Sequence, residues 1–117
     1  MPDLNVREYL NVDGISPFNK WLLGLQDLKA RARIRTRLDR VSLGNLGDYQ
    51  PVGDGVFELR FFFGPGYRVY YGLQDDTNVV LLNGGIKDTQ QRDIRIAKVI
   101  WNDYRKRNNG NQQKISG

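Results

Sequence analysis

The chain has 117 residues, 39% hydrophobic and 26% charged, with a net charge of +5, which indicates one globular domain and favours a polyanionic partner such as nucleic acid. No apolar run approaches the ~20 residues that a membrane span needs, and the absence of cysteine excludes disulfides and thiolate chemistry. Because histidine is also absent, acid–base chemistry would fall to Lys, Arg, Tyr, Asp or Glu, and we expect neither a metal site nor a cofactor.

The N-terminal segment predicts a strand followed by a short helix. Residues 4–10 alternate between apolar and polar side chains, as a half-buried strand does. Ser16 then precedes Pro17, which is the usual order of an N-cap residue and a proline at the first helical position. The apolar face of this helix would consist of Phe18, Trp21, Leu22 and Leu25.

A second, longer helix is predicted over residues 27–44, with Gly44 as its stop. Residues 44–55, which follow, are rich in turn-forming residues and are predicted to be a connector that leads into a strand. The apolar residues of the helix recur at helical spacing and form one stripe, Ala30, Ile34, Leu38 and Val41.

Three strands are predicted after the connector. Residues 56–63 and 67–72 flank the glycine-rich segment 64–66 and read as a hairpin. Residues 79–83 are apolar without alternation, which is typical of an interior strand that is covered on both faces.

A final helix opens at the segment from Asp88 to Gln91, which resembles a capping box. The element order is therefore β-α-α-β-β-β-α. This order predicts an α+β fold with a small antiparallel-rich sheet in one domain over residues 1–105. Residues 106–117 are polar and are predicted to form a disordered tail.

Two arginines lie inside the aromatic hairpin, and its pattern predicts which face they occupy. If the glycine-rich segment is the loop, Phe61 opposes Val69 on an apolar face that packs on the core. Arg60 then opposes Tyr70 on the other face, with Arg68 one step along the ladder. A shift by one residue would expose half of the aromatic side chains, so both arginines are predicted to share the face away from the core.

Neighbouring guanidinium groups repel each other unless an anion lies between them. One interpretation is structural, with a salt bridge to Glu58 or stacking of a guanidinium on Tyr70. The other interpretation is an anion site, in which Arg60, Arg68 and Lys87 converge on phosphate oxygens. Lys87 follows a strand and precedes a helix N-terminus, where backbone amides also favour phosphate.

The longer N-terminal helix is strongly basic. A line of uncompensated cations on it is typical of a surface that follows a nucleic-acid backbone, with strong dependence on salt. The alternative is an ordinary solvated helix face. The cations without an acidic residue three or four positions away are Lys29, Arg33, Arg37 and Arg40.

The chain resembles the RelE/ParE toxin superfamily of bacterial toxin–antitoxin systems, and within it the addiction module killer or phage Gp49-like branch. The resemblance covers roughly residues 17–104. The segments that carry it are FNKWL (18–22), RARIRTRLDR (31–40), GNLGD (44–48), GVFELR (55–60), GPGYRVYY (64–71), LLNGGIKDTQQRDI (81–94) and the helix around Trp101.

This resemblance implies a RelE-like fold with two N-terminal helices on the sheet, a C-terminal helix and a concave basic face. It implies a cytoplasmic toxin with a cognate antitoxin, in this branch often a helix-turn-helix protein. RelE-type toxins cleave mRNA in the ribosomal decoding site, so the ribosome and mRNA are expected partners. ParE-type relatives poison DNA gyrase without cutting RNA, and a non-toxic module that binds nucleic acid or antitoxin is a third alternative.

The resemblance also assigns individual residues. Arg68, in the GYR motif, matches the phosphate-binding arginine of the family, and Arg60 matches the arginine that ends the ELR motif. Lys87 falls where RelE-type toxins carry a basic residue. The sequence departs from the best-studied ribonucleases at Val56 and Glu58, where those enzymes carry a lysine pair, and it lacks their catalytic tyrosine near the C-terminus.

RNA cleavage by this set would need no metal. Arg60 and Arg68 would stabilise the charge that develops on the non-bridging phosphate oxygens. Lys87 would be the proton donor, or the base if neighbouring cations lower its pKa, with Glu58 as the alternative base. Tyr70 is the candidate for stacking on a nucleobase.

Overall fold

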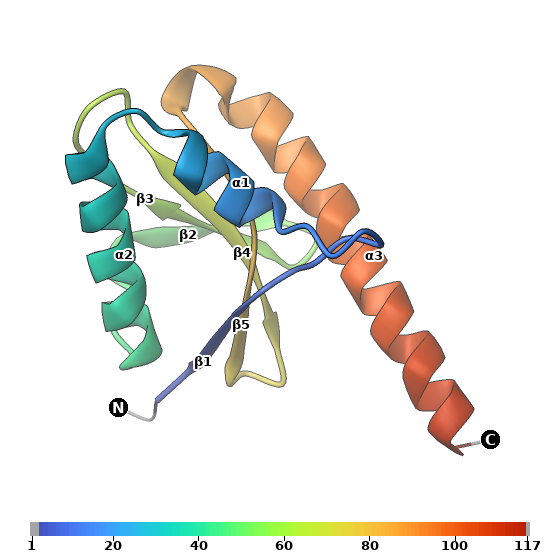
Figure 1. Cartoon of the computed structure of the whole chain (residues 1–117). Helices are drawn as coiled ribbons and strands as arrows, with labels where there is room; N and C mark the ends of the chain where they lie inside the picture. Colours follow the sequence, from blue (N-terminus) through green and yellow to red (C-terminus); the bar gives the residue numbers. More distant parts are fainter. Residues whose placement is uncertain (1–2, 117) are drawn as a thin grey trace.

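The computed structural model describes residues 3–116, and it describes side chains as far as residue 108. A five-stranded sheet lies between helices (Figure 1). In chain order the elements are β1 (Asn5–Glu8), α1 (Pro17–Gly24), α2 (Leu28–Ser42), β2 (Tyr49–Gly53), β3 (Val56–Arg60), β4 (Arg68–Gln74), β5 (Asn78–Gly85), the short 3₁₀ helix η1 (Lys87–Thr89) and α3 (Gln90–Ser116).

The strand order is β1-β5-β4-β3-β2, with β1 parallel to β5 and every other pair antiparallel. The predicted α+β class is therefore confirmed. β5 lies inside the sheet, between β1 and β4, as its continuous apolar run predicts.

Local side-chain caps position the two N-terminal helices. The Ser16 hydroxyl accepts a hydrogen bond from the Asn19 amide (3.0 Å), so α1 starts where the sequence predicts. Asp27 caps α2 in the same way through the Ala30 amide (3.1 Å). Gly44, with φ of 90°, follows the end of α2 in a conformation that favours glycine.

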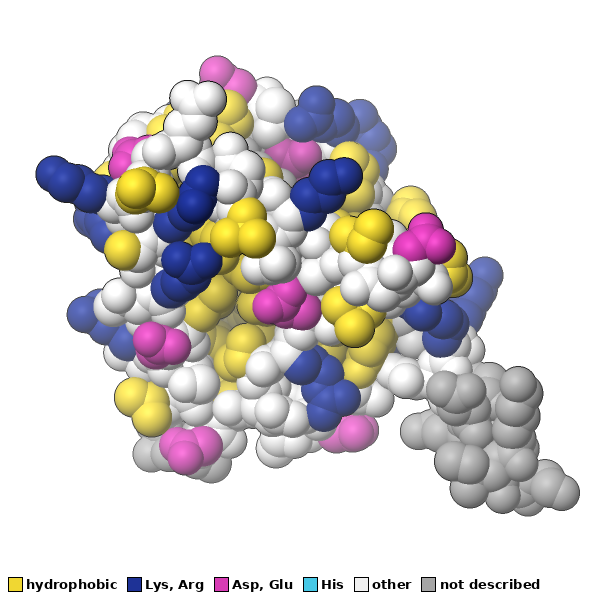
Figure 2. Space-filling view, viewed as in Figure 1, with side chains coloured by type: hydrophobic (Ala, Val, Ile, Leu, Met, Phe, Trp, Pro, Cys, Tyr) yellow, Lys and Arg dark blue, Asp and Glu magenta, His cyan; other side chains and the backbone are white. Residues whose placement is uncertain are grey.

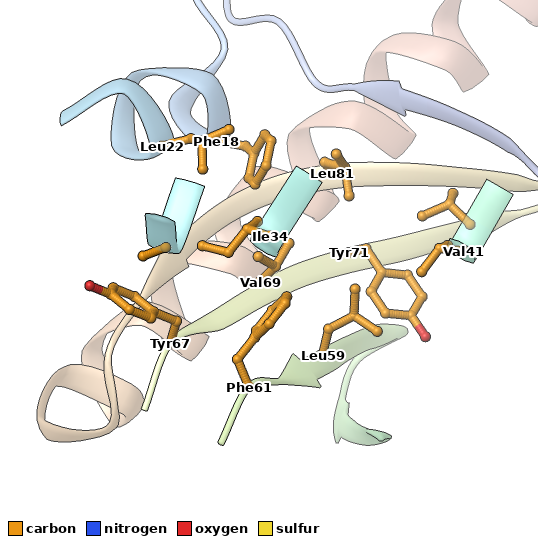
Figure 3. Packing of buried hydrophobic residues seen from close by; sticks show 12 residues of the cluster. Phe18, Leu22, Ile34, Val41, Leu59, Phe61, Tyr67, Val69, Tyr71 and Leu81 are labelled. Atoms are coloured by element: carbon orange, nitrogen blue, oxygen red, sulfur yellow. The ribbon is translucent and has the colours of Figure 1, made fainter. Parts of the chain in front are cut away.

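The sheet is buried on both faces, so the molecule has two hydrophobic layers. Helices α1 and α2 cover one face, where side chains from the helices and strands meet (Figure 3), and α3 covers the other (Figure 1). The first layer includes Phe18, Leu22, Ile34, Val41, Leu59, Phe61, Val69, Tyr71 and Leu81. The second includes Tyr9, Val56, Tyr70, Val80, Leu82, Ala97, Ile100 and Trp101.

Each layer places a tryptophan ring against a strand glycine. Trp21 of α1 lies over Gly84, where an added Cβ would come within 2.2 Å of the ring. Trp101 of α3 lies over Gly72 on the opposite side of the sheet, where the same distance would be 2.5 Å. The two helices therefore approach the sheet backbone at positions that only glycine allows.

The hairpin has the predicted parity but a different register. Leu59 pairs with Val69 and Arg60 with Arg68, so the pairing is shifted by two residues from the predicted one. The Phe61 amide donates to the Tyr67 carbonyl (3.0 Å), which leaves a five-residue loop instead of three. Because side chains alternate every two residues, this shift keeps every aromatic residue on its predicted face.

The connector 44–55 contains a strand that the sequence did not reveal. β2 forms the edge of the sheet beside β3, with a register irregularity between Pro51 and Gly53. An edge strand tolerates proline because one side of its backbone has no strand partner, and its turn-like composition hides it from a pattern search.

Helix α3 continues beyond residue 105, where the sequence predicts a disordered tail. Arg107 lies in this extension, pairs with Asp103 (3.1 Å) and donates to the Leu10 carbonyl (2.5 Å). Residues 106–108 are thus helical, while the side chains of residues 109–117 lie outside the described part of the chain. The domain boundary at residue 105 stays a prediction.

The close approach at Gly84 predicts a large cost for one methyl group. Gly84→Ala should lower the unfolding free energy by about 1–3 kcal/mol, because Trp21 or the strand must move. Gly24→Ala is the matched control, since Gly24 ends α1 with nothing within 4 Å of an added Cβ. Equal stability of the two variants in chemical denaturation would contradict the contact.

Candidate anion-binding site

Arg68 lies at the start of β4 and is buried, with 9% of its surface exposed. Its Nε lies 3.5 Å from Oε2 of Glu58, and its Nη1 donates to the Gly66 carbonyl (2.8 Å). Glu58 is fully buried and also accepts hydrogen bonds from the side chains of Gln50 (3.1 Å) and Gln90 (2.9 Å). Of the two interpretations of the arginine pair, the salt bridge to Glu58 is present.

The face that carries Glu58 and Tyr70 is not exposed, because α3 covers it. Tyr70 lies opposite Glu58 with none of its surface exposed, so it cannot stack on a nucleobase. Burial, and then the charge of Glu58, raise the pKa of Tyr70 above its ordinary value. Glu58 is equally out of reach of a substrate. The expected roles of both residues are therefore corrected.

Arg60 ends β3 directly across from Arg68. Its Nε lies 3.0 Å from Oδ2 of Asp48, and about a third of each of these two side chains is exposed. Each arginine of the pair thus has its own carboxylate, which offsets the repulsion between the two guanidinium groups.

Lys87 is brought to the same place by the turn after β5. Its amide donates to the carbonyl of Pro65 in the hairpin loop (3.3 Å). A Cβ added to Gly66 would lie 3.2 Å from both Nη1 of Arg68 and Cβ of Lys87, so this glycine lets the two cationic side chains approach each other.

A hollow of about 470 Å³ lies where these side chains meet. Arg60, Arg68 and Lys87 all line it, together with the hairpin loop, so the predicted cationic set converges. Asp88 also lines the hollow and is exposed. From the sequence, Asp88 is expected only to cap a helix, although its position directly after Lys87 indicates a second role.

A second hollow, of about 460 Å³, lies beside α2 and shares Arg60 and the residues 61–63 with the first. Together they form one groove, and Figure 2 shows Lys and Arg side chains over α2 at the left of the molecule. Lys29 is not part of this lining. The α2 and connector residues in it are Ala32, Arg33, Thr36, Arg37, Arg40 and Asp48.

Arg37 connects the segments that line the second hollow. Its guanidinium donates to the carbonyls of Arg60 (2.5 Å), Asp48 (2.6 Å) and Leu46 (3.0 Å). Burial lowers the pKa of Arg37 from its ordinary value. Its hydrogen bonds connect α2 to the connector and to the end of β3, which gives Arg37 a structural role, while its role in binding a polyanion stays a prediction.

Arg33 and Arg40, in contrast, are exposed along the groove. The Arg33 guanidinium lies 3.8 Å from the centroid of the Phe63 ring, a cation–π contact that places the charge over the loop. Phe62, between the two hollows, is 80% exposed and was not singled out from the sequence.

Two kinds of site are not found in the described part of the chain. No group of three His, Cys, Asp or Glu side chains is placed there to hold a metal ion. Within the same residues, no helix is both long and apolar enough to cross a bilayer.

A family model, described as Phage derived protein Gp49-like, matches residues 20–102. The chain belongs to this Gp49-like family. The match spans the basic helix, the hairpin and Lys87, which are the segments that form the groove. The predicted resemblance to the RelE/ParE superfamily and its Gp49-like branch is thereby confirmed.

The chain is also similar to two other proteins. An uncharacterized protein of Haemophilus influenzae is 48% identical over 83 residues, which cover 71% of this chain and 84% of the relative. A chain from the crystal structure of the toxin–antitoxin complex RelBE2 of Mycobacterium tuberculosis superposes with a TM-score of 0.53 and 22% identity. That match covers 74% of this chain and all of the other, and it shows a RelE-like fold for the Gp49-like chain.

The three carbonyls around Arg37 predict that lysine cannot replace it. Arg37→Lys should lower the unfolding free energy by about 1–3 kcal/mol, because a single ammonium group cannot reproduce the planar donors. Arg35→Lys, at an exposed position of the same helix, should leave stability unchanged. Thermal and denaturant unfolding of both variants checks this, and similar losses would contradict a structural role for Arg37.

Proposed function

We propose that this protein is the toxin of a toxin–antitoxin module and that it cleaves mRNA on the ribosome without a metal ion. Membership of a RelE-like toxin family supports the first part. The observation that carries the second is the convergence of Arg60, Arg68 and Lys87 on one hollow beside an exposed carboxylate.

In the proposed reaction, the 2′-oxygen of a nucleotide attacks the adjacent phosphorus and the bond from phosphorus to the 5′-oxygen breaks. Asp88 accepts the proton of the 2′-hydroxyl, since Glu58 is buried beneath α3. Arg60 and Arg68 stabilise the negative charge on the non-bridging oxygens. Lys87 gives its proton to the leaving 5′-oxygen.

The buried carboxylate of Glu58 supports this reaction indirectly. Its charge lies 3.5 Å from Nε of Arg68, and the Gly66 carbonyl accepts a hydrogen bond from Nη1, so these two contacts orient the guanidinium before any substrate arrives. A preoriented cation stabilises a transition state without paying for its own reorganisation during the reaction.

The proposed partners follow from the same family membership. The structural neighbour is part of a toxin–antitoxin complex, and we infer a cognate antitoxin for this chain, of the helix-turn-helix type. A second macromolecular partner is the ribosome with its mRNA. The exposed cations Arg33, Arg40 and Lys87 along the groove suit its phosphates.

One observation favours a second function. Both Arg60 and Arg68 are already paired with carboxylates, and the position of Glu58 is buried where RelE-type ribonucleases carry lysine. A toxin of the same fold that blocks a target such as DNA gyrase would need the basic groove but no proton transfer.

The hollow predicts that Lys87 is needed for cleavage. Lys87→Met should reduce mRNA cleavage about 10²-fold or more and relieve growth arrest, because the leaving oxygen loses its proton donor. Asp88→Asn should have a similar effect through loss of the base. Lys29→Met is the matched control, since Lys29 is an exposed cation of α2 outside the hollow lining.

The measurement is induction of each variant, with mRNA ends mapped in the same cells. Cleavage by Lys87→Met and Asp88→Asn at the parental rate would remove this site from the mechanism. Growth arrest by the parent without any cut would replace the ribonuclease with the non-cleaving alternative.

The ion pair between Arg68 and Glu58 predicts that substitution of Arg68 lowers stability as well as cleavage. Arg68→Ala should cost about 3–5 kcal/mol of stability, because it leaves the Glu58 carboxylate buried without its cation. The double variant Arg68→Ala/Glu58→Gln should recover much of that stability while cleavage stays absent. Denaturant unfolding and the cleavage assay together test this, and restored cleavage in the double variant would show that Arg68 acts only on folding.

A further inference from the structure

The hairpin loop exposes one aromatic ring at the centre of the groove. Phe61 and Phe63, on either side of it in sequence, pack with the first hydrophobic layer. Arg37 and Arg33 lie over their rings, at 4.7 and 3.8 Å from the centroids. Phe62 points away from that layer and is 80% exposed.

Cations surround Phe62, beside the apolar residues of the hairpin loop and the carboxylates of Asp48 and Asp88. Phe62 lines both hollows, and the Arg60 guanidinium carbon lies 5.8 Å from the centroid of its ring. Arg40 lines the hollow on one side and Lys87 the hollow on the other. An apolar partner surface would have to desolvate these charges, which makes a purely hydrophobic contact costly.

A single-stranded nucleic acid can contact both the exposed ring and the cations that flank it. Its phosphates match the cations on either side, and its unpaired bases offer planar faces to an aromatic ring. A duplex does not, because its bases are stacked on one another and sequestered from side chains.

We propose that Phe62 is a stacking platform for one nucleobase of single-stranded RNA that lies along the groove. The strand would pass from the α2 side, at Arg33 and Arg40, over the ring to the hollow of Lys87. This inference rests on the proposed function and names a residue that positions the RNA beside the scissile phosphate. Stacking tolerates any base, so Phe62 adds affinity and placement without choosing a sequence.

The test uses a short 2′-O-methyl RNA oligonucleotide, which binds but cannot be cut because the attacking hydroxyl is blocked. Phe62→Leu should weaken its binding about 5- to 150-fold, since base–aromatic stacking is lost while an apolar side chain remains. Phe62→Trp should bind at least as tightly as the parent. Val99→Ala, at a 70% exposed apolar position of α3, should bind as the parent does.

Salt separates stacking from charge. The loss in Phe62→Leu should be the same factor at low and high salt, whereas Arg33→Gln should reduce the slope of log affinity against log salt. The parent should bind an oligonucleotide with an abasic site at the stacked position as weakly as Phe62→Leu binds the intact one. The Phe62 variants should unfold at the parental temperature, since the ring is exposed.

The outcomes are distinct from those for cleavage. If Phe62→Leu binds and cuts RNA as the parent does, the platform is wrong and the proposed reaction stands. If the parent cuts no mRNA but Phe62→Leu still loses affinity, the platform stands without the reaction. Weaker antitoxin binding by Phe62→Leu with unchanged RNA binding would make the ring a protein contact and overturn the inference.

Discussion

The alternation of side chains along β3 and β4 is the constraint on which the rest of the structure depends. Both faces of these strands are covered, one by α1 and α2 and the other by α3, so each residue belongs to one of two layers. The cover on the α3 side begins only at Gln90. Beyond that point the same row of side chains, which buries Glu58, emerges at Arg60 and Phe62. The hollow of Lys87 is therefore the uncovered end of a face that is otherwise core.

Apart from Arg60, which pairs with Asp48 and is partly exposed, the cations around the groove form two groups by what they bind within the fold. Arg37 and Arg68 are largely enclosed and hold backbone carbonyls or a carboxylate, which fixes α2, the connector and the hairpin relative to one another. Arg33, Arg40 and Lys87 lie at the surface and make no ion pair among the described residues. A basic patch of this kind needs inner charges to shape it and outer charges to meet a ligand.

Much of the fold could be predicted from local patterns. Alternation set the faces of the hairpin, and the cap at Ser16 set the start of α1. A register shift of two residues was invisible, because it leaves every face unchanged. The burial of Glu58 and Tyr70 was missed for a different reason. Polar side chains on one face of a strand indicate a solvent-exposed face, and the sequence does not show that α3 packs on this one. In the site, the convergence of the cations was predicted, whereas Phe62 was placed on the same face as Arg60 but was given no role.

The two tryptophan–glycine contacts couple distant parts of the sequence. A side chain at Gly84 requires a smaller residue than Trp21, and one at Gly72 requires the same of Trp101. We therefore expect the glycine and the tryptophan of each contact to vary together in evolution. Because the contacts lie on opposite sides of neighbouring strands, a change in one layer shifts the strand that anchors the other. The Gly84 contact lies next to Gly85, the partner of Arg68. A substitution at either contact would thus displace the strands that carry the groove residues. This limits how far the core sequence can vary while the groove keeps its geometry.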